Sequence, residues 1–356
     1  MPLVAHNNLP AFGKLATEGV RVLASDAAAH QDIRELHIGL LNMMPDAALG
    51  ATERQFFRLI GESNPIAQFY VHPFTLDALP RSEEARDYID KYYDRFDDLR
   101  EQGLDALIIT GANVTQPELS AEDFWESLIE VADWANDNVT STLCSCLATH
   151  AVLEFRYGQR REQQTRKKWG VYEHKVIEPH HPLVADINSR FSVPHSRWNS
   201  IYPGQFDAAG LRTLVVGDDG SVHLATSADG FRTVFFQGHP EYDTVSLLKE
   251  YKREISNYIN GISADYPPLP DNYLGLYESA ILREYASRVD DARENGSSIP
   301  EFPEALVLAT LDNTWHDTAC AVVGNWMGLI YQITHNDRKI PFMSGVNPDD
   351  PLNLSN

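Results

Sequence analysis

The chain has 356 residues, of which 43% are hydrophobic and 22% are charged, so it can bury a substantial core and does not have the composition of a disordered protein. Its 51 acidic and 29 basic residues give a formal charge of −22, which disfavours general binding to nucleic acid or to an anionic membrane. Three cysteines make no disulfide framework, no apolar run reaches the ~18 residues that span a bilayer, and the first residues lack a signal peptide, so we expect a cytoplasmic protein.

Short apolar runs alternate with longer amphipathic segments along the chain. The apolar runs predict buried strands at residues 36–42, 67–71, 106–110, 141–145, 214–216 and 234–237. The amphipathic segments predict helices at residues 52–60, 88–100, 147–157 and 244–259, and a variant capping box at Ser120 predicts another that begins there. This alternation predicts an α/β fold, with a doubly wound, mostly parallel sheet and helices on both faces.

Three regions are expected along the chain. Residues 1–35 are predicted to be an N-terminal extension that packs on the core, and residues 36–265 to be an α/β catalytic domain. Residues 266–356 are predicted to be a C-terminal extension with a charged helix, a loop rich in Gly, Ser and Pro, and a flexible tail from about residue 345.

Cys146 lies where a predicted strand ends and a predicted helix begins. In open α/β sheets, ligands bind beyond the carboxyl ends of the strands. The positive end of a helix dipole favours the thiolate form of a cysteine, and the backbone N–H groups there can stabilise an oxyanion. The small residue Ala148 suits a sharp turn. From this segment alone, however, a buried structural cysteine is slightly favoured, and Cys144 is interpreted as core.

His239 and Glu241 provide the groups that a nucleophilic cysteine needs. They follow a predicted strand that ends at Gly238, so His239 is expected at the same edge of the sheet as Cys146. A cysteine nucleophile requires a base, and the base requires a group that orients it. The three residues therefore form a candidate Cys/His/Glu triad, against the alternative that His239 is an ordinary loop histidine.

Together with the motifs around them, these residues resemble the homoserine O-succinyltransferase family, which includes acetyl-transferring members and has a class I glutamine amidotransferase-like fold. The resemblance runs in order from about residue 9 to 275 and resumes near residue 314. The matching stretches are LNMMP at 41–45, TERQF at 52–56, FDDL at 96–99, LIITGA at 107–112, TSTL at 140–143, GVYEH at 170–174, PHSR at 194–197, GHPEYD at 238–243, NW at 325–326 and YQIT at 331–334. Residues 280–303 look inserted relative to the family.

The resemblance implies an acyltransferase that works through a thioester. Cys146 would attack acyl-CoA and hold the acyl group, and His239 would act as the general base. Glu241 would orient His239 and stabilise its charged form. The product implied is O-acyl-L-homoserine, on the route to methionine. Acyl-CoA is then a co-substrate, and neither a metal nor another cofactor is expected.

The resemblance also implies substrate-binding positions. Arg253 matches an arginine that binds the amino acid carboxylate, and Lys167 and Ser196 match other substrate-binding residues. Thr115 falls where glycine goes with succinyl-CoA and glutamate with acetyl-CoA. Threonine has no carboxylate to repel a succinyl group, so succinyl is favoured over acetyl. The basic residues clustered between 156 and 168 are either a dock for the CoA phosphates or a solvated loop.

Several alternatives stay open at this point. L-serine could replace homoserine as the acceptor, within the same family. A class I glutaminase or amidotransferase would use the same triad, although such enzymes usually have glycines where this chain has Cys144 and Ala148. A non-catalytic relative is disfavoured by the intact set of site residues. His174, His180, His181 and His195 do not have the spacing of a metal site. Relatives imply a homodimer.

Overall fold

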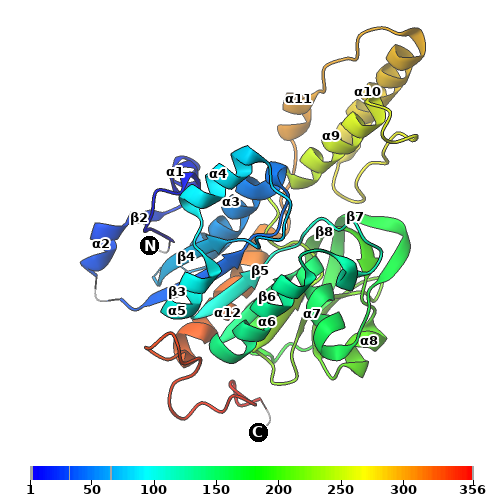
Figure 1. The fold of residues 1–356 in the computed structure, drawn as a ribbon. Helices are drawn as coiled ribbons and strands as arrows, with labels where there is room; N and C mark the ends of the chain where they lie inside the picture. The colour runs from blue at the N-terminus through cyan, green and yellow to red at the C-terminus, as the bar shows by residue number, and fades with distance from the viewer. Residues whose placement is uncertain (1–2, 32, 65, 355–356) are drawn as a thin grey trace.

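A single sheet runs through the computed structural model, which describes residues 3–31, 33–64 and 66–354 (Figure 1). Within these residues the sheet has eleven strands. Their order is β2 (Val22–Ala24), β1 (Leu3–Ala5), β4 (Gln68–Phe74), β3 (Glu35–Leu41), β5 (Ala106–Ile109), β6 (Ser141–Ser145), β11 (Thr233–Phe236), β10 (Val222–Thr226), β9 (Arg212–Gly217), β7 (Glu162–Val176) and β8 (Arg190–Ser200). Neighbours from β2 to β11 are parallel, and the last four strands add in antiparallel fashion.

Helices pack on both faces of this sheet (Figure 1). The α-helices are α1 (Pro10–Thr17), α2 (Ser25–Ala29), α3 (Asp46–Ser63), α4 (Glu83–Tyr92), α5 (Phe96–Gln102), α6 (Trp125–Asn138), α7 (Leu147–Tyr157), α8 (Pro203–Ala208), α9 (Ser246–Ile259), α10 (Leu276–Asn295), α11 (Glu304–Leu308) and α12 (His316–Ile333). Two 3₁₀ turns, η1 (Leu119–Ala121) and η2 (Pro182–Val184), complete the described elements. The predicted α/β class with a mostly parallel sheet is therefore confirmed.

The side-chain pattern of β5 explains why both faces are covered. Ala106 and Ile108 pack into one core with α1, α3 and α12, whereas Leu107 and Ile109 pack into a second core with α5, α6 and α7. Successive side chains of a strand point to opposite faces, so a strand that is apolar throughout needs helices on both sides. The apolar runs in the sequence thus reflect burial on two faces.

The structure corrects two local expectations from the sequence and adds one pair of strands. The helix expected at 88–100 is split into α4 and α5, because the connection between them is extended and Asp94 N–H donates to the Pro73 carbonyl at 2.9 Å. The capping box expected at Ser120 does not form. Ser120 lies in η1, and α6 begins at Trp125. The long strands β7 and β8 were not predicted, because the first half of β7 is polar and exposed.

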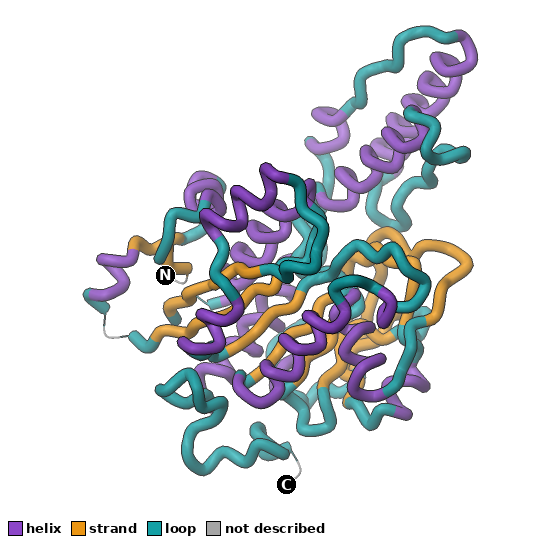
Figure 2. Tube along the Cα trace, in the orientation of Figure 1, coloured by secondary structure: helices purple, strands orange, loops and turns teal. Residues whose placement is uncertain are grey.

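The segments at both ends of the chain join the central structure. β1 and β2 extend the sheet beyond β4, and α12 packs against α3. By contrast, α10 and α11 project away from the sheet beside α9, as the tube in Figure 2 shows. Beyond residue 345 the chain makes turns in which Pro351 is buried. In the part of the chain that the structure describes, no helix is both long and apolar enough to cross a membrane.

Gly170 lies where the C-terminal segment contacts β7, so a substitution at this position tests that attachment. Its φ is +145°, it forms a bridge with Asp271, and a Cβ placed on it would lie 2.0 Å from the Asp271 carbonyl oxygen. We expect Gly170→Ala to lower the free energy of unfolding by about 2 kcal/mol or more, through clash and backbone strain. Urea unfolding measures this change.

Gly204→Ala is the matched control, because a Cβ there meets nothing within 4 Å. Gly204 lies in α8, where alanine has the higher helix propensity, so its stability should be unchanged or slightly higher. Equal stabilities of the two variants would contradict the account of the Gly170 bridge.

Candidate active site

Cys146 lies at the joint between β6 and α7, in a strained backbone conformation. Its φ of 52° and ψ of −106° fall in a region that residues with a Cβ rarely adopt. The Cys146 N–H donates to the Phe236 carbonyl at 2.8 Å, which ties the joint to the neighbouring strand β11. A Cβ placed on Gly111 would lie 3.8 Å from the Cys146 Cβ, so the loop after β5 approaches closely. This geometry is that of a sharp strand-to-helix elbow.

His239 and Glu241 lie beside Cys146, as the sequence predicted. β6 and β11 are parallel neighbours with Ser145 opposite Phe236, so the residues that follow both strands emerge at the same edge. His239 Nδ1 donates to Glu241 Oε1 at 2.8 Å, and the Cys146 side chain is a hydrogen-bond partner of the same imidazole. The side chains of His239 and Glu241 are only 11% and 5% exposed, respectively. The structure therefore brings the three residues of the candidate triad together.

The charges in this group favour a protonated imidazole. Burial alone would lower the pKa of His239, but the negative charges of Cys146 and Glu241 and their hydrogen bonds raise it well above the usual value. The other two cysteines are different, because burial raises the pKa of both Cys144 and Cys320 to about 12. Cys146 is thus the thiol that lies against a protonated imidazole, the kind of partner that a cysteine nucleophile requires.

A partly buried carboxylate that sequence reasoning missed, Glu250 on α9, lies at the centre of a second group. Ser196 Oγ donates to Glu250 Oε2 at 2.6 Å, and Lys167 Nζ lies 3.4 Å from the same oxygen. The Tyr242 hydroxyl donates to Glu250 Oε1 at 2.6 Å, and its ring stacks on His239 with centroids 4.3 Å apart. Burial would raise the pKa of Glu250, but Lys167 and these hydrogen bonds leave it lower than usual.

This second group connects two predicted substrate-binding residues, Lys167 and Ser196, to the imidazole of the triad. A signal for Glu250 was present in the sequence. It follows Leu247 by three positions, at the edge of the apolar face of the predicted helix, where a carboxylate is unusual unless it has partners.

Arg253 occupies a more open position on the same helix. Its side chain is 63% exposed and pairs with its neighbour Glu254 at 3.1 Å. It lies one turn after Glu250, on a helix in which residues three apart are neighbours. The structure thus places Arg253 close to the second group along α9 but pairs its guanidinium with Glu254.

Thr115 is held by a carboxylate from its own loop. Its N–H donates to Glu122 Oε1 at 2.6 Å, and its hydroxyl donates to Glu122 Oε2 at 3.2 Å. Gln116 N–H donates to Oε1 as well, so Glu122 is satisfied by backbone and hydroxyl donors. Arg161 lies close to this loop, with Nη2 3.4 Å from the carbonyls of Gln116 and Pro117.

Two arginines bring positive charge to Cys146. Burial lowers the pKa of Arg197 to about 10 and also lowers that of Arg161, while the negative charge of Cys146 acts in the opposite direction on both. Among the described residues, Arg197 Nη2 and Arg161 Nε are buried nitrogens without a hydrogen-bond partner. Buried donors of this kind are costly unless a ligand satisfies them. Arg197 was overlooked in the sequence, although it belongs to the PHSR motif, whereas Arg161 was predicted only as a member of the basic cluster between residues 156 and 168.

An open groove of about 620 Å³ leads along β7 and β8 past this region. Its lining includes Arg166, Lys167, Lys168, Tyr172, Arg197 and Tyr202. Most of the basic cluster expected between residues 156 and 168 is paired with acidic residues. Arg160 lies 3.0 Å from Glu118, Arg166 lies 2.6 Å from Asp271, and Lys168 lies 2.6 Å from Asp219. The cluster is therefore not a free basic patch.

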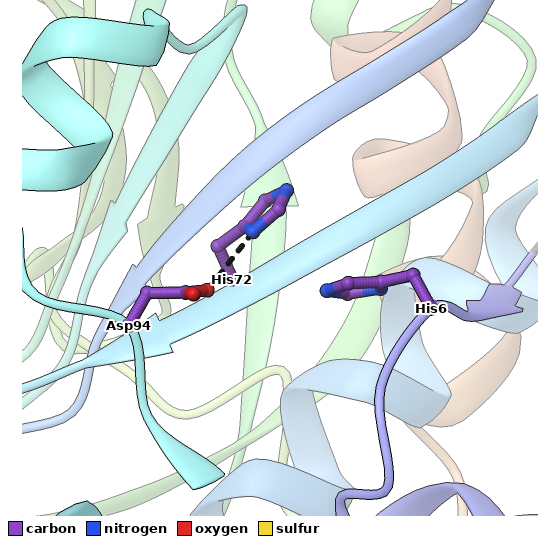
Figure 3. Close-up of side chains that lie close together, drawn as sticks. All are labelled: His6, His72 and Asp94. Atoms are coloured by element: carbon purple, nitrogen blue, oxygen red, sulfur yellow. Dashed lines mark hydrogen bonds and ion pairs between the residues drawn. The ribbon is translucent and has the colours of Figure 1, made fainter.

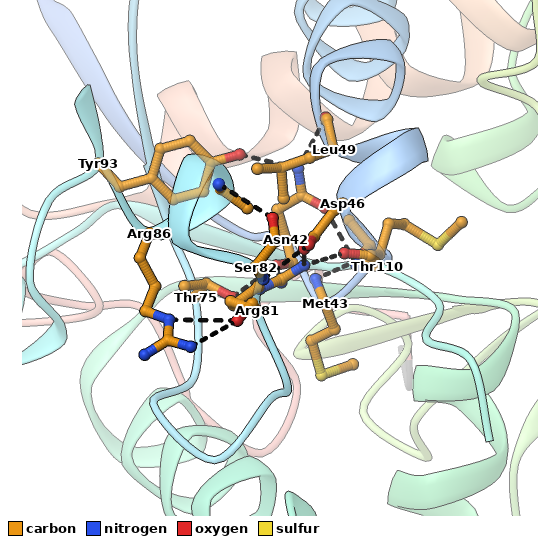
Figure 4. Close-up of polar contacts among 12 residues, drawn as sticks. Asn42, Met43, Asp46, Leu49, Thr75, Arg81, Ser82, Arg86, Tyr93 and Thr110 are labelled. Atoms are coloured by element: carbon orange, nitrogen blue, oxygen red, sulfur yellow. Dashed lines mark hydrogen bonds and ion pairs between the residues drawn. The ribbon is translucent and has the colours of Figure 1, made fainter. Parts of the chain in front are cut away.

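A polar network fixes the loop that carries the LNMMP motif (Figure 4). Asn42 donates to the Leu49 carbonyl at 3.1 Å and to the Tyr93 hydroxyl at 3.0 Å. Arg81 donates to the Met44 carbonyl at 2.6 Å. The Met44 sulfur lies 3.9 Å from the position of a Gly111 Cβ, so this loop borders the elbow. The network thus positions the carboxyl end of β3 next to Cys146.

Comparisons with known proteins agree with the motif resemblance. A family model described as homoserine O-succinyltransferase matches residues 2–336. The homoserine O-succinyltransferases of Allochromatium vinosum and Nitrosococcus oceani are 65% and 61% identical to this chain over 354 residues, with 99% of each chain covered. The protein of the same name from Cardiobacterium hominis is 49% identical, again with 99% of each chain covered.

Among solved structures, the chain is similar to glutamine amidotransferases. One from Thermotoga maritima has a TM-score of 0.41 at 9% identity and covers 85% of this chain and 99% of its own. One from Methylobacillus flagellatus has a TM-score of 0.42 at 10% identity and covers 83% of this chain and 95% of its own.

Replacing Cys146 tests the ion pair at the elbow. Because the negative charge of Cys146 raises the pKa of His239, we expect Cys146→Ala to lower that pKa. The imidazolium form should then be lost at a lower pH than in the parent chain. NMR titration of the His239 ring resonances in isotope-labelled protein measures the change.

Cys144→Ala is the matched control, because the Cys144 thiol is buried two residues away and its raised pKa keeps it uncharged at neutral pH. It should leave the titration of His239 where it is. The same His239 pKa in parent and Cys146→Ala chains would show that Cys146 carries no charge beside the imidazole.

Proposed function

The chain belongs to the homoserine O-succinyltransferase family, and we propose that it transfers a succinyl group from coenzyme A to the hydroxyl of L-homoserine through a thioester on Cys146. The observation that carries the proposal is the contact of Cys146, at a strained strand-to-helix elbow, with His239, which is itself paired with Glu241. The thioester divides a transfer between two bulky substrates into two half-reactions at one sulfur.

In the first half-reaction, the Cys146 thiolate attacks the thioester carbonyl of the acyl donor. The C–S bond to coenzyme A then breaks, and the coenzyme A thiolate takes the proton from the His239 imidazolium. Backbone N–H groups at the start of α7 are suited to stabilise the oxyanion that forms. The products are the acyl-enzyme, free coenzyme A and a neutral His239.

In the second half-reaction, neutral His239 accepts the hydroxyl proton of homoserine while the hydroxyl oxygen attacks the Cys146 thioester. The Cys146 thiolate leaves, and the thiolate–imidazolium pair is restored. Glu241 accepts from Nδ1 at 2.8 Å throughout, which fixes the tautomer that presents Nε2 to the sulfur and to the acceptor. Atoms and protons balance across the two steps.

The group around Glu250 is suited to recognise the amino acid. Its carboxylate can accept from an ammonium group, and Lys167 beside it can bind a carboxylate. Arg253 would contribute if its guanidinium exchanged Glu254 for the substrate carboxylate. Because Tyr242 joins Glu250 to the ring of His239, an amino acid held here would have its side-chain hydroxyl close to the base.

The preference for a succinyl group rests on charge. Relatives that are 57–65% identical are named homoserine O-succinyltransferases. Arg197 and Arg161 have buried, unpaired nitrogens and feel the charge of Cys146, so they can bind the free carboxylate of a succinyl group. The Glu122 carboxylate beside Thr115 already accepts from two backbone N–H groups and a hydroxyl, which lessens its repulsion of a second carboxylate.

The groove along β7 and β8 is suited to the coenzyme A moiety, because Lys167 and Arg197 lie both in its lining and in the site. The product, O-succinyl-L-homoserine, would be an intermediate on the route to methionine. A homodimer and a cytoplasmic location stay predictions from the resemblance.

Intact-protein mass spectrometry tests the chemical step. Incubation with succinyl-CoA should add one succinyl group to the parent chain, and subsequent L-homoserine should remove it with formation of O-succinylhomoserine. Cys146→Ala should show no adduct and should lose activity by at least ~10³-fold, because the nucleophile is absent. L-serine and L-glutamine serve as alternative acceptors in parallel reactions.

Cys144→Ala is the control, since it removes a buried thiol from the same strand and should keep the adduct. Full activity of Cys146→Ala would refute the mechanism. Glutamine hydrolysis without turnover of acyl-CoA would refute the function, and discharge by serine in preference to homoserine would assign a different acceptor.

A substitution of Arg161 tests whether this side chain is the source of the preference for succinyl-CoA over acetyl-CoA. We expect Arg161→Gln to raise the KM for succinyl-CoA about tenfold or more and to change the KM for acetyl-CoA little, because only the succinyl group has a free carboxylate. Arg160→Gln is the matched control, since Arg160 is 65% exposed and pairs with Glu118. Equal effects of Arg161→Gln on both donors would assign Arg161 to coenzyme A or to the fold instead.

A further inference from the structure

A second cluster of ionisable side chains lies away from the candidate active site. It consists of His6, just after β1, His72 on β4, and Asp94 between α4 and α5 (Figure 3). One nitrogen or oxygen atom from each of the three lies within 4.8 Å of the others. β4 is three strands away from β6 in the sheet, a separation of roughly 14 Å at the usual strand spacing. The proposed acyl-transfer chemistry uses none of these side chains.

The backbone fixes the tautomer of His6. Its Nδ1 lies 3.2 Å from the Val4 carbonyl oxygen, so Nδ1 carries the proton and donates it there. The lone pair is then on Nε2, whose only hydrogen bond within the described residues is a long one of 3.4 Å from the Asn7 amide. In Figure 3 the far end of the His6 ring points toward Asp94 and His72. A backbone carbonyl on one ring nitrogen is the usual partner of a histidine that binds metal through the other.

The series of hydrogen bonds that begins at Asp94, passes through His72 and ends at Glu35 lacks one proton. His72 Nδ1 lies 3.0 Å from Asp94 Oδ2, His72 Nε2 lies 2.9 Å from His37 Nδ1, and His37 Nε2 lies 3.2 Å from Glu35 Oε2. Three contacts between two carboxylates need three protons, but two neutral imidazoles carry only two. Either a third proton or a cation at one end can complete this chain.

A cation at the Asp94 end completes this chain. If His72 Nδ1 binds a cation, His72 Nε2–H can donate to His37 Nδ1, and His37 Nε2–H can donate to Glu35. Each of the two remaining hydrogen bonds then has one donor and one acceptor, and the tautomers of His72 and His37 are fixed. Glu35 also accepts from the Tyr70 hydroxyl, so the outermost carboxylate of the chain is itself held in place.

We propose that His6 Nε2, His72 Nδ1 and the Asp94 carboxylate bind one divalent cation of the Zn²⁺ class, with water as a further ligand. Two imidazoles and a carboxylate are donors that suit Zn²⁺ and its neighbours in the first transition series. Ligand atoms on a tetrahedral Zn²⁺ lie roughly 3.3 Å apart, given its ~2.0 Å bonds, whereas the three candidate ligand atoms lie within 4.8 Å of one another, so a separation near that limit must contract. His6, which is only partly buried, can make that movement.

The cation would attach the N-terminal segment to the sheet. Among the described residues, β1 covers only Leu3–Ala5 and pairs with β4 at the single register Leu3–Phe69. A bond from His6 to His72 and Asp94 would add a second attachment between β1 and β4 and would also fix the connection between α4 and α5. Binding of a ligand to the folded state alone raises stability.

A second candidate group, Glu62 with His316 and Cys320, is weaker. His316 Nε2 lies 2.9 Å from Glu62 Oε2 and 3.6 Å from the Cys320 sulfur, so the same nitrogen already serves both partners. Burial raises the pKa of Cys320 to about 12, which makes its thiolate costly to form. This group therefore serves as the control for metal binding elsewhere on the chain.

The test uses the full chain, freed of metal with a chelator and then titrated with ZnCl₂ by calorimetry. Bound zinc is counted by mass spectrometry after dialysis, and Co²⁺ is added separately to record its ligand-field spectrum. We expect one Zn²⁺ per chain and a higher Tm with zinc than without it. His6→Ala and Asp94→Asn should each weaken zinc binding at least tenfold and abolish the rise in Tm.

His180→Ala, at an exposed histidine, and His316→Ala should leave zinc binding and the rise in Tm as in the parent chain. Loss of zinc in His316→Ala with retention in His6→Ala and Asp94→Asn would overturn the proposal. So would the absence of stoichiometric binding by the parent chain. If the parent chain binds no zinc and its Tm rises on acidification, a third proton rather than a cation completes the hydrogen-bond chain, and the proposal is wrong.

Discussion

The pairing of β6 with β11 is the constraint on which the rest of the site depends. It places Ser145 opposite Phe236, so the two strands end together, and the Cys146 N–H is held by the Phe236 carbonyl. Thr149 strengthens the same joint, because its hydroxyl lies 2.9 Å from the carbonyl oxygens of both Cys144 and Phe236. The positive φ of Cys146 costs about 1–3 kcal/mol, and these contacts from both strands hold it in place. The proposed nucleophile is therefore held rigidly beside its proposed base.

Around this joint, the local charge is opposite to that of the whole molecule. The formal charge of the chain is −22. The side chains whose pKa the charge of the Cys146 sulfur acts to raise, however, include the cationic groups of His239, Arg197 and Arg161. The nearby carboxylates Glu241 and Glu250 are each engaged by donors. An acidic surface around a basic site repels anions in general, but a concave site focuses its own field, so an anionic acyl donor can still be attracted there.

The sequence predicted the parts of this arrangement that follow from strand ends, and it missed the parts that depend on tertiary contacts. Cys146 and His239 each follow an apolar run, and parallel strands align their carboxyl ends, so their proximity was predictable. Glu250 contacts Ser196 and Lys167 only because α9 packs over the long antiparallel strands β7 and β8. These strands were not predicted, because the first half of β7 is polar. Ser120 was expected to begin a helix, but it lies in η1, and the carboxylate of nearby Glu122 binds the backbone of the Thr115 loop. Local signals could not reveal that competition between a helix cap and a loop.

The unpaired polar atoms near the elbow connect stability with function. Arg197 Nη2, Arg161 Nε and Glu241 Oε2 are buried without partners among the described residues, and a buried unsatisfied group typically costs about 1–3 kcal/mol. The fold tolerates these costs where two cores, on opposite faces of the sheet, supply a large hydrophobic contribution. An anionic substrate that accepts hydrogen bonds from these arginines would give their unpaired nitrogens the partners that the protein itself does not supply. Because that gain is available only to a ligand with acceptors in these positions, the same unpaired donors that weaken the fold would favour the succinyl donor over an uncharged one.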